Sequence, residues 1–436
     1  MKSNDIINKF IKYVSLNVLG MIGLSCYILA DTFFVSKGMG ADGLTALNLA
    51  ISIYSFIHGT GLMVGIGGAT RFGILRSQGE EKKADRIFSQ SVFIGLFLGT
   101  AYVFIGVFAS GVLSRILGAD QVTFQMTSVY LKTILCFSPA FILNNVMIAF
   151  VRNDGNPKLS MAAMLTGSIS NIILDYVFIF PLDMGMFGAA FATGLAPAIS
   201  IFILLLHVFK KKNGFHLCRF KLSVKKSIDI VSLGLSAFIN EFASGIVLII
   251  FNLVILGIAG NTGVAAYGIV ANLSLVAASV FTGIGQGLQP IVSASYGWKK
   301  AGDLKKAKKY GWVLAICTAI FIYILVSVYA GPLVNIFNGE KNPVLARYAA
   351  TGIYIYFTGF VFSGINVVMS AYLSAVERPK DALMVSITRG GLAIIPLVFI
   401  MSEAFGMAGV WLSFPSAEAL ACLVCIHAVT KSKKLS

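Results

Sequence analysis

Apolar residues occupy long, regularly spaced stretches of the chain rather than the short runs typical of a soluble core. A helix of about 20 apolar residues spans a bilayer, and the chain contains twelve stretches of at least that length. These stretches cover residues 13–36, 47–72, 89–114, 126–150, 159–180, 187–209, 228–258, 264–294, 310–330, 346–374, 382–402 and 407–429. The pattern predicts an all-α polytopic membrane protein with twelve transmembrane helices.

The basic residues are distributed unevenly between alternate loops. With both termini on one side of the membrane, 28 of the 34 lysines and arginines fall in loops on that side. Only Lys37, Arg115, Lys341 and Arg347 fall in the opposite loops. Because Lys and Arg accumulate in cytoplasmic loops, we expect a multi-pass protein of the cytoplasmic membrane with both termini in the cytoplasm. The first apolar stretch leads straight into a polytopic chain, so we expect no cleavable signal peptide.

The composition argues against several other classes of protein. The net charge of +16 is dispersed over short loops between spans, so we expect no nucleic-acid partner. The six cysteines and four histidines lack metal-ligand spacing, and Cys422 and Cys425 lie inside an apolar helical stretch. We therefore expect neither an enzyme nor a cofactor.

An internal repeat divides the chain into two halves. Residues 40–68 align with residues 260–288 at an offset of 220, and four glycines coincide. These pairs are Gly40 and Gly260, Gly43 and Gly263, Gly65 and Gly285, and Gly67 and Gly287. Because each half has an even number of spans, the halves are predicted to be parallel repeats with the same orientation. We predict an N-terminal six-helix lobe (1–209), a basic cytoplasmic linker (210–227) and a C-terminal six-helix lobe (228–436).

The glycine-rich segment 61–73 has some features of a phosphate-binding loop. It lacks the Gly-Lys-Ser/Thr ending of such loops and lies inside a span. Small residues at this spacing allow two helices to approach closely, which is the interpretation that we favour.

Four acidic residues lie well inside predicted spans, where a charge costs about 2.5–3.5 kcal/mol on insertion scales. They are Asp31, Asp175, Glu241 and Glu418. Asp31 and Asp175 lie at the same depth in the outer half of the first lobe. Tyr27 and Asn171 precede them by one helical turn, and Tyr130 and Thr193 reach the same level. Such oxygens can bind a dehydrated Na⁺, or the two carboxylates can share a proton.

The repeat counterparts of the two aspartates, Phe251 and Leu397, are uncharged, so ion coupling would belong to the first lobe alone. An alternative is a structural ion pair between Lys132 and one of the aspartates. Arg389 and Glu418 lie at similar depth in neighbouring spans and are candidates for a buried structural ion pair. Glu241 has no evident basic partner in the sequence and is a candidate cavity residue that attracts cations.

Five segments together resemble one family, the multidrug and toxic compound extrusion (MATE) transporters, especially the DinF-like and MepA-like bacterial members. They are ADTFFVSKGMGADGLTALNLA (30–50), RNDGNPKLSMAAMLTGSISNIILDYVFIF (152–180), FGAAFAT (187–193), GIGQGLQPIVSASYG (283–297) and GVWLSFPSAE (409–418). The resemblance extends over nearly the whole chain. It implies a V-shaped, two-lobed exporter that is driven by inward H⁺ or Na⁺ movement and ejects amphiphilic, often cationic compounds.

The resemblance also implies residue roles. The family's cation site corresponds to Asp31, Asn171, Asp175 and Thr193, with Tyr27, Tyr130 and Asn145 in its hydrogen-bond network, and the family's span 7 glutamate is similar to Glu241. Some members have a proline in span 1 where this chain has Leu16, so a kink there would have to come from Gly20 or Gly23.

We therefore predict a monomeric, cation-coupled secondary antiporter that exports drugs or toxic compounds by alternating access. One rival is a lipid-linked oligosaccharide flippase of the same superfamily, for which Arg389 would be the main cationic cavity residue. A second rival is an intramembrane enzyme or a channel.

Overall fold

The computed structural model describes residues 3–338 and 342–431, and within these ranges the chain is almost entirely helical with no strand. The predicted all-α class is therefore confirmed. Four of the loop lysines counted above lie outside the described residues: Lys2, Lys341, Lys433 and Lys434.

The first half of the chain forms six helices. They are α1 (Ser3–Ser77), α2 (Glu81–Ile116), α3 (Phe124–Cys136), α4 (Ser138–Asn153), α5 (Pro157–Ile179) and α6 (Gly185–Phe209). The helices α3 and α4 make one span that bends by 48°. The long helix α1 contains two spans, because Gly40 has φ 68°, a left-handed conformation that glycine adopts without strain.

The second half repeats this arrangement. Its helices are α7 (Val224–Gly297), α8 (Ala301–Val328), α9 (Ala330–Phe337), α10 (Pro343–Tyr356), α11 (Phe360–Ala375), α12 (Pro379–Ile387), α13 (Ile394–Phe405) and α14 (Met407–Lys431). A π-helical turn at Thr388–Leu392 joins α12 and α13. Gly260 turns α7 at φ 60°, as Gly40 turns α1. With these two turns, the ten apolar elements of the described chain provide the twelve predicted spans.

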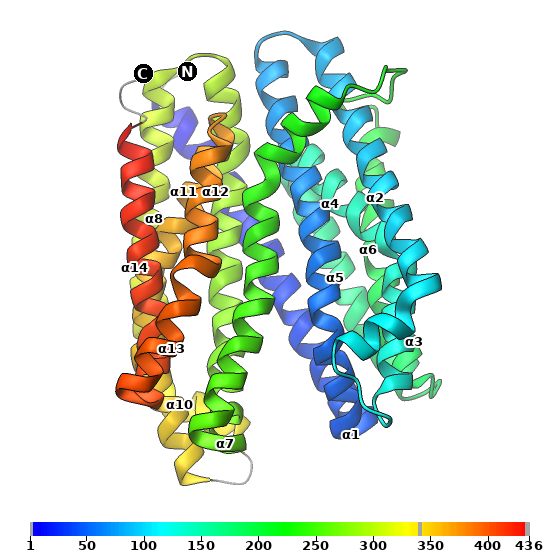
Figure 1. The fold of residues 1–436 in the computed structure, drawn as a ribbon. Coiled ribbons are helices and arrows are strands. Elements are labelled where there is room, and N and C mark those ends of the chain that lie inside the picture. Colours follow the sequence, from blue (N-terminus) through cyan, green and yellow to red (C-terminus); the bar gives the residue numbers. More distant parts are fainter. Residues whose placement is uncertain (1–2, 339–341, 432–436) are drawn as a thin grey trace.

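The two halves form two lobes, the N lobe (α1–α6) and the C lobe (α7–α14), which Figure 1 shows side by side. The first turns of α1 and the last turns of α14 lie at the same end of the bundle, here called the termini end (Figure 1). The lobes are close together at this end and diverge towards the other.

Paired glycines set the contact between the lobes. A Cβ added at Gly67 would overlap the carbonyl oxygen of Ile230 in α7, and one at Gly287 would lie 2.7 Å from Cα of Val14 in α1. The second span of each lobe therefore packs on the first span of the other lobe, as expected for two halves related by a pseudo-twofold axis. These contacts also support the interpretation of segment 61–73 as a helix-packing surface.

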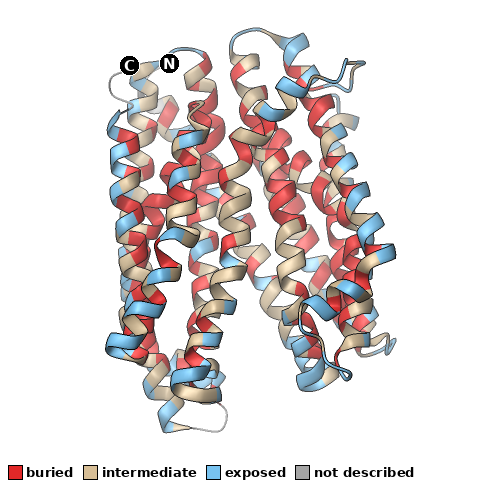
Figure 2. Cartoon of the chain, viewed as in Figure 1, coloured by how far each residue is buried: buried red, intermediate tan, exposed pale blue. Residues whose placement is uncertain are grey.

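The N lobe and the C lobe differ in their cores. The C lobe has one continuous apolar cluster, to which Ile6, Phe10 and Val14 of α1 also contribute. The N lobe has two separate clusters, one around Phe72 and Phe150 and another that includes Val35. Figure 2 shows the buried residues inside the lobes and exposed residues along their outer surfaces. Many exposed side chains are apolar, including Phe108 of α2, which suits a surface that faces lipid.

The linker between the lobes joins α6 to α7. It covers residues 210–223, and α7 begins at Val224 rather than after residue 227. Phe215 anchors the linker because its ring is buried against Phe88, Phe150 and Phe72.

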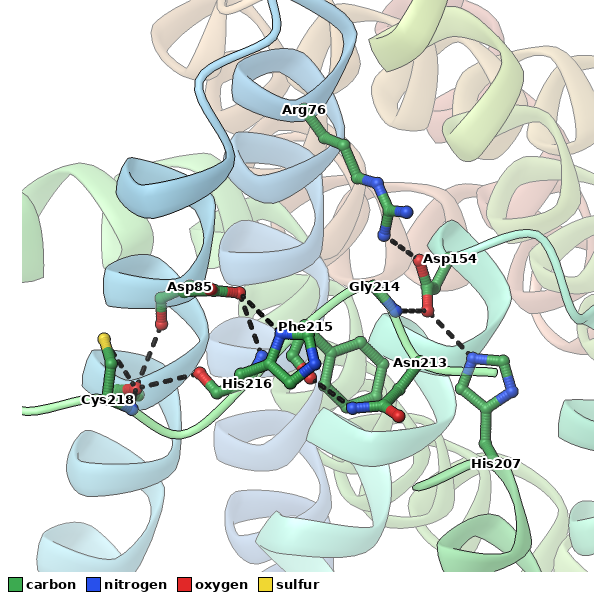
Figure 3. A network of polar contacts seen from close by, with 10 residues as sticks. Arg76, Asp85, Asp154, His207, Asn213, Gly214, Phe215, His216 and Cys218 are labelled. Carbon is green, nitrogen blue, oxygen red and sulfur yellow. Dashed lines mark hydrogen bonds and ion pairs between the residues drawn. The ribbon is translucent and has the colours of Figure 1, made fainter. Parts of the chain in front are cut away.

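Asp154 ties this linker to the end of the N lobe (Figure 3). Its carboxylate accepts hydrogen bonds from the backbone N–H of Gly214 at 2.6 Å and from His207 Nε2 at 2.8 Å, and it pairs with Arg76. The lysine-rich linker is therefore fastened along the termini end of the N lobe.

The first span is an uninterrupted helix up to Gly40, so Gly20 and Gly23 do not break it. Both glycines face α5, where an added Cβ would lie 2.8 Å from Sδ of Met164 at Gly20 and 2.6 Å from Cδ2 of Leu165 at Gly23. Their role in this structure is to let α1 and α5 pack closely.

Candidate functional site

Asp31 on α1 and Asp175 on α5 lie together between the two apolar clusters of the N lobe. Asp175 is 0% exposed and Asp31 is 7% exposed, and their charges are close enough to interact. One carboxylate oxygen of each, Oδ1, is buried without a hydrogen-bond partner. A buried carboxylate oxygen that lacks a partner is costly, so the arrangement favours binding of a cation or a proton.

Asn171 and Thr193 complete one side of this group. With the Asn171 amide oriented to satisfy both of its neighbours, its nitrogen donates to Asp175 Oδ2 at 3.0 Å and its oxygen accepts from the Thr193 backbone N–H at 3.3 Å. Tyr130 on α3 is buried beside the Thr193 hydroxyl and near both carboxylates. The four residues predicted for cation coupling are thus adjacent, as is Tyr130.

Tyr27 contacts a second tyrosine, which was not among the site residues predicted from the sequence. Its hydroxyl lies 2.7 Å from that of Tyr54, in the second span of α1. Asn145 is farther along, and its side-chain amide donates to the Phe141 carbonyl at 3.1 Å. The structure gives Asn145 no hydrogen bond to either aspartate.

The alternative of an ion pair with Lys132 is not realised. Lys132 is exposed on α3, and among the described residues it forms no ion pair with Asp31 or Asp175. No basic side chain therefore neutralises the two aspartates in the part of the chain that the structure describes.

A central cavity of about 380 Å³ lies between the lobes. This volume is within the range of about 300–1,000 Å³ that is typical of sites for drug-sized molecules. Asp31, Tyr27, Tyr54 and Thr193 line it from the N lobe. The C lobe contributes mainly apolar and aromatic residues, with three charged groups among them: Glu241, Arg389 and Glu418.

Glu241 has a partner that its sequence position did not reveal. Its Oε1 lies 2.9 Å from Nδ1 of His58, which belongs to the N lobe and stacks on Tyr54 with ring centroids 5.8 Å apart. The expectation that Glu241 has no basic partner is therefore wrong, because a helix of the other lobe supplies one. The Glu241 side chain is still 37% exposed, so it presents negative charge to the cavity.

Arg389 and Glu418 form the buried pair that their depths predicted. Arg389 Nη2 lies 2.6 Å from Glu418 Oε1 and also donates to Ser363 Oγ at 2.9 Å. Asn366 donates to the other carboxylate oxygen at 2.7 Å, and Arg389 Nη1 donates to Asn240 at 3.3 Å. Partners thus surround both charges.

A further set of polar residues joins the lobes at the termini end. Arg152 of α4 is 1% exposed, and its Nη1 donates to Asn17 at 2.7 Å and to Gln286 of the C lobe at 3.0 Å. Arg71 donates to Asp229 at 2.6 Å and pairs with Glu377. From the sequence alone, both arginines are predicted to be cytoplasmic loop charges. For Arg152, which is buried, only its place at the end of an apolar stretch hints at this burial.

The described residues lack the side-chain groups that usually hold metal ions in proteins. They contain no group of three or more His, Cys, Asp or Glu side chains placed to hold a metal ion. Cys422 and Cys425 are buried and free inside α14.

Two pseudo-symmetric helical lobes around a cavity, with buried acidic groups in the membrane-spanning region, have the architecture of a multi-pass membrane transporter. The MatE family model matches residues 18–177 and 237–400, which is most of the chain. The chain belongs to the MatE family of MATE transporters.

Related proteins agree with this assignment. The chain is 27% identical to "Multidrug export protein MepA" of Staphylococcus saprophyticus, over 93% of this chain and 89% of that protein. It is 26% identical to the Staphylococcus aureus protein of the same name, with the same coverage. A solved structure described as the outward-facing conformation of a multidrug resistance MATE family transporter of the MOP superfamily has the same fold. It matches with a TM-score of 0.92 at 22% identity and covers 98% of this chain and 96% of that one.

Proposed function

We propose that the chain is a secondary antiporter that exports amphiphilic, mainly cationic compounds by alternating access, driven by inward movement of H⁺ or Na⁺. The observation that carries this proposal is the pair of buried carboxylates, Asp31 and Asp175, each with an unpartnered oxygen beside the central cavity. A cation or proton that binds there removes the cost of burying two negative charges. Asn171, Thr193, Tyr27 and Tyr130 supply further oxygens around the bound ion.

Ion and substrate act on the same equilibrium between two arrangements of the lobes. An ion shifts this equilibrium only by the difference between its affinities for the two states. Neutralised carboxylates favour the arrangement in which they are most buried, whereas substrate in the central cavity favours the other. This competition exchanges inward ion movement for outward substrate movement.

The central cavity suits amphiphilic cations. Its walls include the aromatic rings of Tyr267, Tyr356, Phe360 and Phe414, and the exposed part of Glu241 supplies negative charge. Aromatic faces attract cations as well as apolar groups. The related MepA proteins are named as multidrug exporters, which is consistent with a cavity that accepts varied compounds.

We propose that the protein lies in a bacterial cell membrane with its termini end facing the cytoplasm. This orientation agrees with the distribution of loop lysines and arginines. In this orientation the structure corresponds to an outward-facing state, because polar contacts at the termini end close the cytoplasmic side. One chain contains both lobes and the cavity between them, so we propose a monomer as the functional unit.

A lipid-linked oligosaccharide flippase is not favoured. A pyrophosphate group needs a free cationic side chain in the cavity, and Arg389 is engaged by Glu418, Ser363 and Asn240. The related proteins are also named for drug export.

The proposal is tested by dye efflux from vesicles in which proton and sodium gradients are imposed separately. We expect one gradient to drive export of cationic dyes and Asp175→Asn to abolish it in correctly folded protein. Asp183→Asn is a matched control, because Asp183 is exposed in the loop between α5 and α6. Gradient-driven export that persists in Asp175→Asn would disprove the coupling role.

A further inference from the structure

A second, smaller cavity lies inside the N lobe, and we call it the inner cavity. It measures about 70 Å³. Side chains of α1, α4, α5 and α6 line it, and Gln286 of α7 lies at its boundary. Its polar lining residues include Asn144, Asn145, Ser168 and Ser200. The C lobe has a continuous apolar core, whereas this cavity, which combines apolar and polar side chains, occurs in the lobe whose core is divided.

Several polar atoms around the inner cavity are buried without a protein partner. They are Asn144 Oδ1, Ser168 Oγ, Ser200 Oγ and Arg152 Nε. Ser168, Ser200 and Arg152 are each at most 4% exposed. Buried polar groups nearly always form hydrogen bonds, and polar cavities larger than about 15 Å³ hold water whereas apolar ones stay dry. The inner cavity therefore has both the volume and the polar lining for several water molecules.

The inner cavity adjoins the central cavity at one end. Tyr27, Tyr54 and Thr193 line both spaces, and the hydroxyls of the two tyrosines lie 2.7 Å apart. Asp31 faces the central cavity beside this boundary. The residues shared by the two cavities thus include Tyr27 and Thr193, which lie in the same wall of the central cavity as Asp31.

Arg152 closes the other end of the inner cavity, towards the termini end. Its guanidinium donates to Asn17 of the N lobe and to Gln286 of the C lobe. A buried positive charge repels a passing cation, and the repulsion is strong where little water screens it. Because Gln286 belongs to the other lobe, separation of the lobes at the termini end removes one of the two acceptors that hold Arg152 in place.

We infer that the inner cavity is a water-filled passage through which the coupling ion leaves the Asp31–Asp175 site for the cytoplasm, and that Arg152 gates this passage. The ion then exits within the N lobe, separately from the substrate in the central cavity. The gate opens only when the lobes part at the termini end, which links ion release to the inward-facing state. This inference rests on the proposed function and adds to it a route and a gate.

Hydroxyl-radical footprinting tests whether the inner cavity holds water. X-ray radiolysis produces radicals from bound water, and these oxidise adjacent methionines to sulfoxides. Met21 and Met164 line the inner cavity and are 7% and 8% exposed, whereas Met147 in the same lobe and Met407 in the C lobe are 8% exposed and do not line it. We expect Met21 and Met164 to oxidise several-fold faster than the two matched controls. Equal rates would overturn the inference.

A variant tests whether the passage carries the ion. Ser200→Leu adds an apolar side chain to the inner cavity and should lower both the oxidation of Met164 and gradient-driven dye efflux at least ten-fold. Slow oxidation of Met147 in the same sample shows that the lobe is still packed. Normal efflux in a folded Ser200→Leu protein with a dry cavity would overturn the passage.

The two proposals fail in different ways. If Asp175→Asn abolishes coupled efflux but Met21 and Met164 oxidise no faster than Met147, the passage is wrong and the antiporter stands. If Met21 and Met164 oxidise rapidly but Asp175→Asn exports dye normally, the coupling site is wrong, and the passage then carries no coupling ion.

Discussion

The N lobe and the C lobe have the same helical arrangement but different interiors. Each is turned at an equivalent glycine, Gly40 or Gly260, and each contributes a second span that packs on the other lobe. The N lobe nevertheless has a polar layer between two apolar clusters, whereas the C lobe is continuous. The fold therefore does not require the polar layer.

The C-lobe residues that correspond to the two aspartates are apolar and pack in the C-lobe core. Phe251, which corresponds to Asp31, is 0% exposed and stacks on Tyr267 with ring centroids 5.3 Å apart. Leu397, which corresponds to Asp175, packs against the C-lobe core. The charged pair of the C lobe, Arg389 and Glu418, has protein partners, whereas each N-lobe aspartate has an unpartnered oxygen. A lobe with paired charges suits a structural role, and one with unpaired acids suits ion binding.

The largest effect is expected when an N-lobe aspartate is replaced by the residue that occupies the equivalent position in the C lobe. Asp175→Leu places the C-lobe residue in the N lobe, and we expect it to abolish gradient-driven efflux. Because an unpartnered carboxylate is replaced by an apolar side chain, we also expect the protein to become more stable by about 1–3 kcal/mol. Vesicle efflux and thermal unfolding in detergent measure the two effects. A less stable variant that still couples would show that the polar layer is structural.

The next effect concerns the C-lobe pair. Arg389→Met leaves Glu418 buried and unpaired, so we expect it to lower stability by about 3–5 kcal/mol. The double variant Arg389→Met with Glu418→Leu should recover most of this loss. Lys132→Met, at an exposed lysine, serves as the control and should change stability by less than about 0.5 kcal/mol. Little destabilisation by Arg389→Met would mean that the C-lobe pair, like the N-lobe acids, is not needed for folding.

Smaller effects are expected where the two lobes are equivalent. Gly67→Ala and Gly287→Ala each crowd the contact between lobes, which costs about 1–3 kcal/mol in the packed arrangement. We expect each to slow efflux several-fold and to reduce cross-linking of cysteines placed across the termini end. Gly331→Ala is the control, because an added Cβ there has no neighbour within 4 Å. Strongly different effects of the two glycine variants would show that the contact between the lobes is not pseudo-symmetric.

The smallest effect tests the contribution of the C lobe to substrate binding. Glu241→Gln removes a partly exposed charge, which typically contributes less than about 1 kcal/mol, or a factor of about three to five in affinity. We expect the half-saturating concentration of a cationic dye to rise by that factor while an uncharged analogue is unaffected. An equal rise in the half-saturating concentration of both dyes would show that Glu241 acts by holding the lobes together through His58, and not by attracting the cation.

Much of the fold followed from local pattern. Apolar stretches predicted the spans, matched glycines predicted the repeat, and the depth of each acidic residue predicted which of them would lie close together. Depth along a helix was sufficient for Asp31 and Asp175 because both helices cross the same layer. It was also sufficient for Arg389 and Glu418 in neighbouring spans.

The sequence by itself determined the helices, their order and the lack of charge at the repeat counterparts of Asp31 and Asp175. These depend on hydropathy, helical period and internal similarity, which are properties of short segments. Only the tertiary structure decided that His58 faces Glu241, that Tyr54 meets Tyr27 and that Arg152 bridges the lobes. Such contacts depend on the rotation of each helix and on the packing of segments 27 to 183 residues apart. No pattern within a single helix encodes them.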